Sequence, residues 1–303
     1  MIFRERRGIP LDRTVTYQIE AKEEGLEILA FLRSKGFSRH ILTQMKADKH
    51  AILLNGEKAY GRTILTEGDC LRIRILETET SEKIIPVKIN LHILYEDEDL
   101  LVINKPAGMP IHPSQGNYEN TLANGAAFYA MEKGEAFVYR CVNRLDRDTT
   151  GALILAKNPL SAAVLSSQMR NRQIRRTYLA IVEGIPPKKG TISAPIARVN
   201  GSTIEREINF QTGETAVTHF ERLAVKNGYS LMELHLETGR THQIRVHMKY
   251  LGYPLPGDYL YHPNYDRIRR QPLHSYQLEF THPLTGEGLL FTASLPEDFV
   301  CAF

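Results

Sequence analysis

The feature that most constrains the fold is a series of short segments, in the second half of the chain, whose apolar and polar residues alternate. RRTYLAIVEG (175–184), TAVTHFERLA (215–224) and YSLMELHLETG (229–239) show this pattern, and Gly or Pro residues separate such segments. Alternation with a period of two is typical of a strand with one buried face. GTISAPIARV (190–199) and GEGLLFTASL (286–295) are shorter strands of the same kind, so we expect a predominantly antiparallel sheet.

Helical patterns are fewer in this part of the chain. TLANGAAFYAMEK (121–133) predicts one helix, and NPLSAAVLSSQMRNRQI predicts a second that is entered at Asn158-Pro159, because proline suits a first helical turn. RTHQIRVHMKYLG predicts a third helix, ended by Gly252. Strands that outnumber helices and do not alternate with them regularly indicate an α+β domain.

The first 80 residues predict a separate compact unit of two helices and a hairpin. Helical spacing places four apolar residues on the inner face of the first helix: Leu26, Leu29, Ala30 and Leu32. Gly36 would end that helix and Ser38 would cap the next, whose inward residues would be Ile41, Leu42 and Met45. Asn55-Gly56 is a strong hairpin signal. A strand with Leu71, Ile73 and Ile75 inward follows.

Length and composition fit two domains and indicate a reducing compartment. The chain has 303 residues, a net charge of +3 and three cysteines without metal or disulfide spacing. ETETSEKIIPVKIN (77–90) is polar and reads as a linker, so we expect domains at 1–80 and 91–303 joined by 81–90. No secretory signal and no apolar run of about 18 residues is present, so we expect a cytoplasmic protein without a membrane partner.

The stretch NRLDRDTTG (143–151) places Asp146 and Asp148 beside arginines, just before the apolar run ALILAK. Nearby positive charge favours an ionised carboxylate. From chemistry alone, Asp146 could be a nucleophile, a weak base, a cation ligand or half of a structural ion pair. Asp148 and the threonines could close a turn through side-chain to backbone bonds, with Gly151 supplying unusual dihedral angles.

The order of elements in residues 1–80 resembles the alpha-L, or S4-like, RNA-binding module. The motifs GFSRHILTQM, LLNGE and LTEGDCLRI carry this resemblance. It implies that the helical pair contacts RNA through Ser38, Arg39, His40 and Lys46, although Arg39 and His40 are also compatible with a solvated helix start.

From about residue 92 onward the chain resembles the RluA-type RNA pseudouridine synthases. Four motifs occur in the family's order: INKPAGMPIHP, RLDRDTTGALILAK, RRTYLAIVEG and LETGRTHQIRVHMKYLGYPLPGD. The resemblance implies a long mixed, mainly antiparallel sheet flanked by helices and split by a cleft. It also implies isomerisation of specific uridines in rRNA or tRNA to pseudouridine, without a cofactor or a metal.

Several site residues follow from the resemblance. Asp146 matches the essential catalytic aspartate, Tyr178 the tyrosine that stacks on the base, and Arg245 the arginine that pairs with the aspartate. Arg144 matches an arginine that helps to hold the RNA open, and Lys105 belongs to a KP loop with a mainly architectural role. Flipping a base out of a stack costs a few kcal/mol, which stacking on an aromatic ring partly offsets. The sequence leaves open a covalent or a carbocation-like intermediate.

Four further arginines are candidate phosphate contacts: Arg170, Arg172, Arg175 and Arg176. The chain departs from the family at Asn143, where histidine is usual, so the resemblance assigns no direct chemical role to that position. We expect His112, His242, His247 and His274 to serve packing or hydrogen bonding.

Two other functions remain open on the sequence: a catalytically silent RNA-binding protein on the same fold, and a hydrolase that uses Asp146. The intact Asp146, Tyr178 and Arg245 disfavour the first, and the lack of a paired catalytic carboxylate disfavours the second. We expect a monomer that binds RNA.

Overall fold

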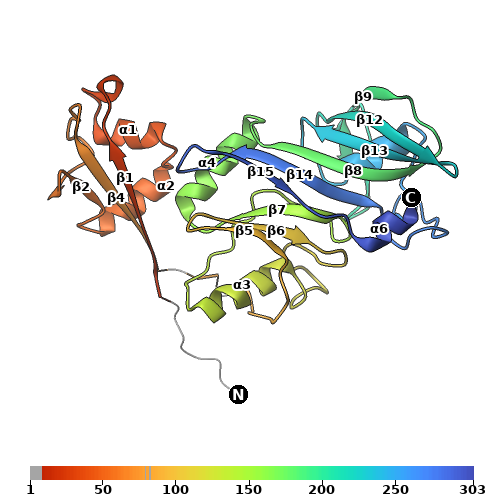
Figure 1. Ribbon diagram of the computed structural model, residues 1–303, viewed down its shortest axis with the longest axis horizontal. Helices are drawn as coiled ribbons and strands as arrows, with labels where there is room; N and C mark the ends of the chain where they lie inside the picture. The colour runs from red at the N-terminus through yellow and green to blue at the C-terminus, as the bar shows by residue number, and fades with distance from the viewer. Residues whose placement is uncertain (1–8, 79, 82) are drawn as a thin grey trace, which may run out of the picture.

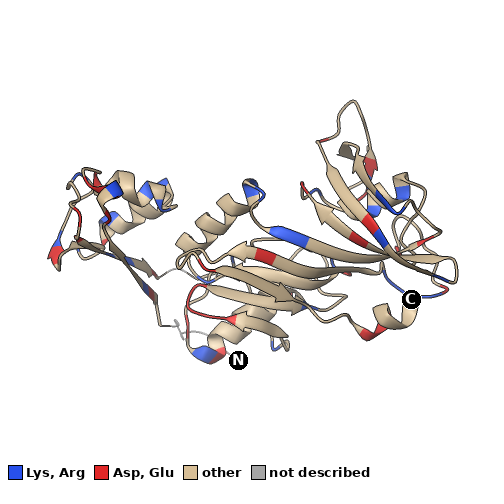
Figure 2. Ribbon diagram, turned by 45° about the horizontal axis from the view of Figure 1, so that its top comes forward, with Lys and Arg blue, Asp and Glu red and all other residues tan. Residues whose placement is uncertain are grey.

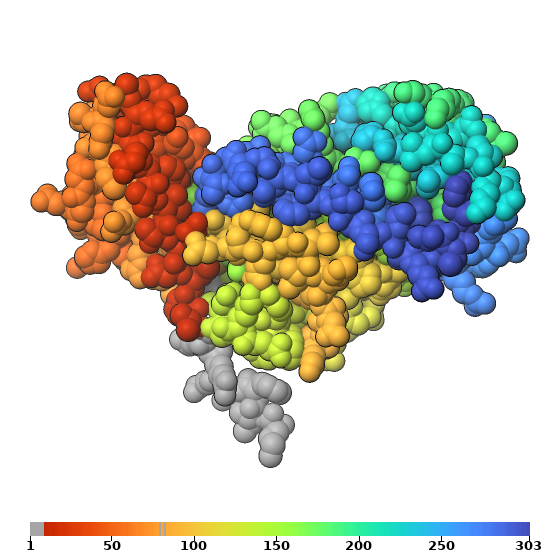
Figure 3. All heavy atoms as spheres, viewed as in Figure 1, coloured from red at the N-terminus to blue at the C-terminus, as the bar shows by residue number. Residues whose placement is uncertain are grey.

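The computed structural model describes residues 9–78, 80–81 and 83–303 and shows an elongated molecule with a separate lobe at its N-terminal end (Figures 1 and 3). This N-terminal lobe contains a four-stranded sheet in the order β1-β4-β2-β3. Its elements are β1 (Leu11–Gln18), η1 (Ala21–Glu23), α1 (Ile28–Ser34), α2 (Arg39–Gln44), η2 (Met45–Ala47), β2 (Ile52–Leu54), β3 (Glu57–Lys58) and β4 (Cys70–Glu77).

The predicted helix pair and hairpin of this lobe are present, but the buried face of α1 differs from the prediction. Leu26 precedes the helix and is 38% exposed, and Ala30 is also exposed. Leu32 is buried and Leu29 is partly buried against the core, as predicted, but Ile28 and Phe31 complete the buried face. The prediction was wrong because it counted Leu26 as the first helical residue, which rotated the expected apolar face.

The other local predictions for the lobe are confirmed. The Ser38 hydroxyl caps α2 by accepting the Ile41 N–H at 3.3 Å. Asn55 and Gly56 both have positive φ angles, 53° and 86°, as the tight hairpin turn requires. Strand β1 was not predicted, because within its length only Val15 is buried and the apolar pattern is therefore weak.

The larger part of the chain is built on a nine-stranded mixed sheet in the order β5-β6-β7-β14-β8-β13-β12-β9, with β15 paired to β14. Its strands are β5 (Ile93–Glu96), β6 (Leu100–Lys105), β7 (Thr150–Ala156), β8 (Arg175–Glu183), β9 (Lys189–Ser193), β12 (Val217–Lys226), β13 (Tyr229–Leu236), β14 (Leu273–Thr281) and β15 (Gly288–Thr292). The pair β7–β14 is parallel, and the other described pairs are antiparallel. The fold is therefore α+β, as expected.

Helices flank this sheet, and a small ribbon lies beside it. The helices are α3 (Leu122–Lys133), α4 (Pro159–Arg170), α5 (Gln243–Tyr250) and α6 (Glu297–Ala302), and the ribbon pairs β10 (Ile196–Arg198) with β11 (Arg206–Ile208). The three longer helices correspond to the predicted ones, and Asn158 caps α4 as expected. None of the described helices has the length and apolar composition needed to cross a membrane.

Helix α4 also packs against the N-terminal lobe. Leu160, which is fully buried, belongs to the lobe's hydrophobic core, and Ala163, Val164 and Leu284 pack against that core. Apolar surface is thus shared between the two parts of the molecule, so removing the lobe would expose α4.

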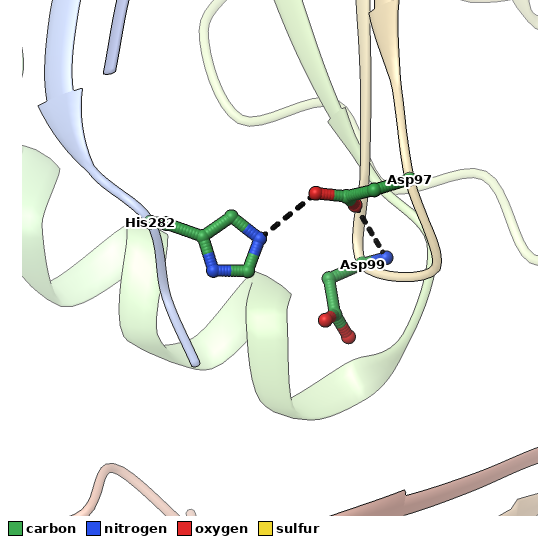
Figure 4. Close-up of side chains that lie close together, drawn as sticks. All are labelled: Asp97, Asp99 and His282. Carbon is green, nitrogen blue, oxygen red and sulfur yellow. Dashed lines mark hydrogen bonds and ion pairs between the residues drawn. The ribbon is translucent and has the colours of Figure 1, made fainter. Parts of the chain in front are cut away.

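A polar cluster strengthens this junction: Asp97, Asp99 and His282 lie together beside α4 (Figure 4). Three carboxylates or imidazoles at such spacing could hold a metal ion, but protein donors already occupy them. Asp97 accepts His282 Nε2 at 3.0 Å, and Asp99 accepts Asn158 Nδ2 at 2.6 Å. Asp99 also binds Arg13 of β1 through two bonds of 2.9 and 3.0 Å. The cluster therefore ties the lobe to the sheet.

Candidate active site

A buried lysine binds the backbone of the loop that carries Asp146. Lys105 is 0% exposed, and its Nζ donates to the backbone oxygens of Pro106 (2.8 Å), Met109 (2.9 Å) and Arg147 (2.8 Å). Burial lowers the pKa of Lys105 to about 7, whereas three carbonyl acceptors match the three N–H bonds of the ammonium. The KP segment thus has an architectural function, because it fixes the backbone next to Asp146.

Asn143 is bound to the backbone of β7. Its Oδ1 accepts the Ile154 N–H at 2.9 Å, its Nδ2 donates to Ala152 O at 3.4 Å, and the residue is 3% exposed. The amide supplies one donor and one acceptor to a strand, which gives position 143 a structural explanation in this chain.

Gly151 allows the end of this loop to enter the sheet. Its φ is +108°, and a Cβ at this position would lie 2.2 Å from Ser275 O. Only glycine permits so close an approach of two backbones. Ser275 pairs with Gly151 on one side and with Tyr178 on the other, so this contact sets the position of the Asp146 loop relative to Tyr178.

Asp146 is bound by an arginine from a distant helix. Arg245 Nη1 of α5 donates to Asp146 Oδ2 at 2.9 Å, and the Asp146 side chain remains 25% exposed. The rest of the guanidinium grips Asp258, with Nε–Oδ2 at 2.6 Å and Nη2–Oδ1 at 2.7 Å. The side chains of Arg245 and Asp258 are 2% and 1% exposed. Asp258 therefore aligns the arginine, and the arginine presents Asp146 to the solvent-accessible side.

Asp146, Tyr178 and Arg245 line one pocket of about 820 Å³. Tyr178 is 4% exposed and lies within the main core, where burial raises the pKa of its phenol. The pocket has room for a nucleotide-sized ligand. Its apolar walls include Ile111, Met169, Leu236, Ile244 and Leu273.

Arginines lie along the same pocket. Arg144, Arg170, Arg172 and Arg176 line it, and Figure 2 shows basic residues at the end of α4 and at the start of β8. Arg144 and Arg170 are exposed, and Arg172 binds Glu237 at 2.5 Å. Arg176 has a buried Nε without a hydrogen-bond partner among the described residues. Positive charge beside a pocket of this size suits an anionic ligand.

The remaining predicted contacts lie elsewhere. Arg175 borders a neighbouring hollow and binds Glu279 at 3.4 Å. Ser38, Arg39, His40 and Lys46 lie on the N-terminal lobe and form no part of this pocket. Arg39, His40 and Lys46 are exposed there.

The prediction that the Asp148 side chain closes the turn by binding the backbone is wrong. The Asp148 carboxylate binds the Arg147 side chain, at 2.9 Å to Nη2, rather than a backbone N–H. The turn is closed by Thr149 N–H donating to Asp146 O at 3.2 Å. Arg147 therefore neutralises Asp148, and the charge partner of Asp146 comes from 99 residues away.

All four histidines pack or form hydrogen bonds, as predicted. His247 and His274 are fully buried and hydrogen-bonded, and His112 packs edge-on against Tyr139. His242 packs edge-on against Tyr261 and is hydrogen-bonded to its hydroxyl at 2.8 Å. His112 and His242 also line the pocket, and His242 Nε2 lies 3.9 Å from Asp146 Oδ1.

Sequence reasoning missed two members of this site, Asp258 and His242. Asp258 closes the same motif that contains Arg245, directly after Gly257. Because a buried arginine needs a counter-ion, this aspartate was a usable candidate for that partner. Gly257 has a φ of +69°, and a Cβ there would lie 2.4 Å from Ile268 O. His242 gave no such signal, since its conformation is set by the fold.

A pocket that joins a partly exposed carboxylate, a buried tyrosine and several arginines fits the predicted family, and known proteins similar to this chain bear this out. A sequence model of the RNA pseudouridylate synthase family matches residues 99–250, which include all three predicted catalytic residues. The chain belongs to the RNA pseudouridine synthases. It is an isomerase of the RluA type that converts uridine in RNA to pseudouridine.

Individual relatives agree. An uncharacterized RNA pseudouridine synthase of Bacillus subtilis, YjbO, is 42% identical over 87% of this chain and 93% of its own length. Ribosomal large subunit pseudouridine synthase D of Neisseria meningitidis is 35% identical over 86% of this chain and 73% of its own. The solved structure of human RNA pseudouridylate synthase domain containing 1 is 28% identical, with a TM-score of 0.57 over 68% of this chain and 83% of that one.

Proposed function

We propose that Asp146 is the catalytic carboxylate of this synthase and acts on a uridine whose base has been flipped into the pocket. The observation that carries the proposal is the chain Asp258–Arg245–Asp146, in which two buried groups hold a partly exposed carboxylate toward the pocket. Charge-assisted bonds of this kind fix orientation, which a reacting group requires.

Tyr178 and the arginines have separate roles in this proposal. Tyr178 forms an aromatic wall beside the base, and burial raises its phenol pKa, so the ring is neutral when the base arrives. Arg144 holds the opened RNA, whereas Arg170, Arg172 and Arg176 contact phosphates around the pocket. Arg175 would contact RNA that extends beyond it.

We propose ribosomal RNA of the large subunit as the substrate. Relatives named ribosomal large subunit pseudouridine synthase D share 34–41% identity with this chain. Mapping pseudouridines in total RNA from cells without the gene tests this. Complementation with the wild-type protein should restore at least one missing large-subunit position, and Asp146→Asn should restore none. Loss of pseudouridine only from tRNA would contradict the rRNA assignment.

We propose that the N-terminal lobe is an S4-like RNA-binding domain over residues 1–80. Support comes from its order of helix, helix and hairpin, and from the exposure of Arg39, His40 and Lys46 on the helical pair. The lobe would supply affinity rather than chemistry, because its cations lie outside the pocket.

Surface substitutions test this lobe better than truncation, since truncation would uncover Leu160. Arg39→Glu and Lys46→Glu, made singly, should each weaken RNA binding and reduce its salt dependence, because fewer phosphates are neutralised. Lys226→Glu makes the same change of charge at an exposed residue of β12 and should leave both unchanged. An equal effect of Lys226→Glu would show that only net charge matters. We also expect the protein to be cytoplasmic and monomeric. Light scattering of the purified protein measures its oligomeric state.

A further inference from the structure

His242 has an unusual conformation next to the predicted catalytic carboxylate. It is the N-cap of α5 with a φ of 59°, in the left-handed region that few non-glycine residues adopt. Its side chain is 11% exposed, and its ring packs edge-on against Tyr261 at 5.6 Å between centroids. This conformation turns Nδ1 toward Tyr261 and Nε2 toward the pocket side of Asp146.

The hydrogen bonds of Tyr261 determine which imidazole nitrogen carries the proton. The Arg206 backbone N–H donates to the Tyr261 hydroxyl oxygen at 2.9 Å. Among the described residues, the hydroxyl hydrogen has one acceptor within reach, His242 Nδ1 at 2.8 Å, and this favours the tautomer in which Nδ1 accepts. Burial lowers the pKa of His242, so the ring is neutral at neutral pH. A neutral imidazole that accepts at Nδ1 carries its hydrogen on Nε2.

This Nε2–H has no acceptor among the described residues. Asp146 Oδ1, at 3.9 Å, is beyond hydrogen-bond distance, and Arg245 already holds the other carboxylate oxygen. Since His242 lines the pocket, an acceptor that enters there can take the place of water at this donor. The donor therefore points to an acceptor that enters the pocket with the substrate.

We propose that His242 donates a hydrogen bond from Nε2 to the O2 carbonyl oxygen of the target uracil. This rests on the proposed role of Asp146. When the bond between C1′ and N1 breaks, its electron pair passes into the uracil ring and is shared with O2 and O4. O2 lies two bonds from N1 and so beside C1′, where Asp146 acts, whereas O4 lies across the ring. A fixed donor at O2 stabilises this charge as it develops.

The test pairs a protein change with an atom change in the RNA. His242→Asn suits the position, because asparagine tolerates a positive φ, but its amide is too short to reach the same acceptor. The substrate RNA carries either uridine or 2-thiouridine at the target, since sulfur is the weaker acceptor. Single-turnover rates are measured at saturating enzyme.

For uridine, His242→Asn should slow the reaction on the order of 100-fold, the usual cost of one such donor. The wild type should slow on the order of tenfold with 2-thiouridine, whereas His242→Asn should show almost no further loss. Tyr261→Phe keeps the ring but frees Nδ1, so its loss should be smaller and its response to 2-thiouridine reduced. RNA affinity should remain near that of the wild type.

Equal slowing of wild type and His242→Asn by 2-thiouridine would overturn the inference. The inference would also be overturned if the effect of His242→Asn disappeared on RNA with 2′-deoxyuridine at the target, because the contact would then be to the ribose. Both results leave Asp146 untouched. An active Asp146→Asn protein would reject the proposed function itself, so the two failures are distinguishable.

Discussion

Replacing Asp258 by asparagine tests whether the buried pair with Arg245 supports the site. The side chain keeps its shape, and its oxygen can still accept the N–H groups of Leu260 and Tyr261, now at 3.1 and 3.2 Å. The two short bonds to the guanidinium, 2.6 and 2.7 Å, lose their charge, and the new NH2 group faces another donor.

Breaking a buried ion pair by removing one partner costs about 3–5 kcal/mol. Because asparagine retains one acceptor oxygen, we expect a loss of about 3 kcal/mol in the free energy of unfolding, measured by urea denaturation. We also expect slower turnover, because Arg245 loses one of its two bonds to residue 258 and is held less firmly toward Asp146.

Asp298→Asn is the matched control. Asp298 grips Arg270 with the same geometry, 2.6 and 2.7 Å, but its side chain is 49% exposed. We expect about 1 kcal/mol or less and normal turnover, since solvent reaches the Asp298 carboxylate and screens this pair. If the two variants lost equal stability and Asp258→Asn kept full activity, the supporting role of the buried pair would be refuted.

Three further predictions follow from single residues. Gly151→Ala should lower the free energy of unfolding by more than about 3 kcal/mol, because its Cβ would lie 2.2 Å from Ser275 O. Gly116→Ala, where φ is also positive but a Cβ meets nothing within 4 Å, should lower it by about 1 kcal/mol, and equal unfolding midpoints would contradict the close approach at Gly151. Burial lowers the pKa of His274 to about 4, so the unfolded chain takes up a proton first as the pH falls below 6.5, and stability present above that pH is lost. Wild type should therefore lose about 3 kcal/mol more than His274→Gln between pH 7 and 4, and parallel curves in urea titrations would count against this. Arg245→Lys should greatly reduce single-turnover rates with modest loss of RNA binding, because lysine lacks the planar fork that reaches both carboxylates; near-normal rates would argue against that function.

The sequence predicted the fold where the pattern was strong and local. The longer helices, the Asn55-Gly56 hairpin and the alternating strands carried their own signals, whereas the short helix α6 was not predicted. Strand β14 was not predicted, because it contains His274 and Ser275, which are polar but fully buried and hydrogen-bonded to β7. Such burial depends on partners that lie far away in the chain.

In the site, too, local motifs could be predicted from the sequence, whereas contacts between distant residues could not. The motifs identified Asp146, Tyr178 and Arg245, and the structure brings them to one pocket. The sequence could not reveal that Arg147 binds Asp148 instead, nor that Asp258 holds Arg245, because the choice among several arginines and aspartates is made by the tertiary structure. The orientation of His242 is likewise a product of packing against Tyr261.

The most direct test of the account is the release of tritium from carbon 5 of labelled uridine in RNA by Asp146→Asn and Asp148→Asn. Asp146→Asn is nearly isosteric but lacks an anionic oxygen, so it should release no tritium while its melting temperature and RNA affinity stay near those of the wild type. Asp148→Asn loses an ion pair with the half-exposed Arg147, so it should retain activity with a stability loss on the order of 1 kcal/mol. Full tritium release by Asp146→Asn would contradict the assignment of the catalytic carboxylate.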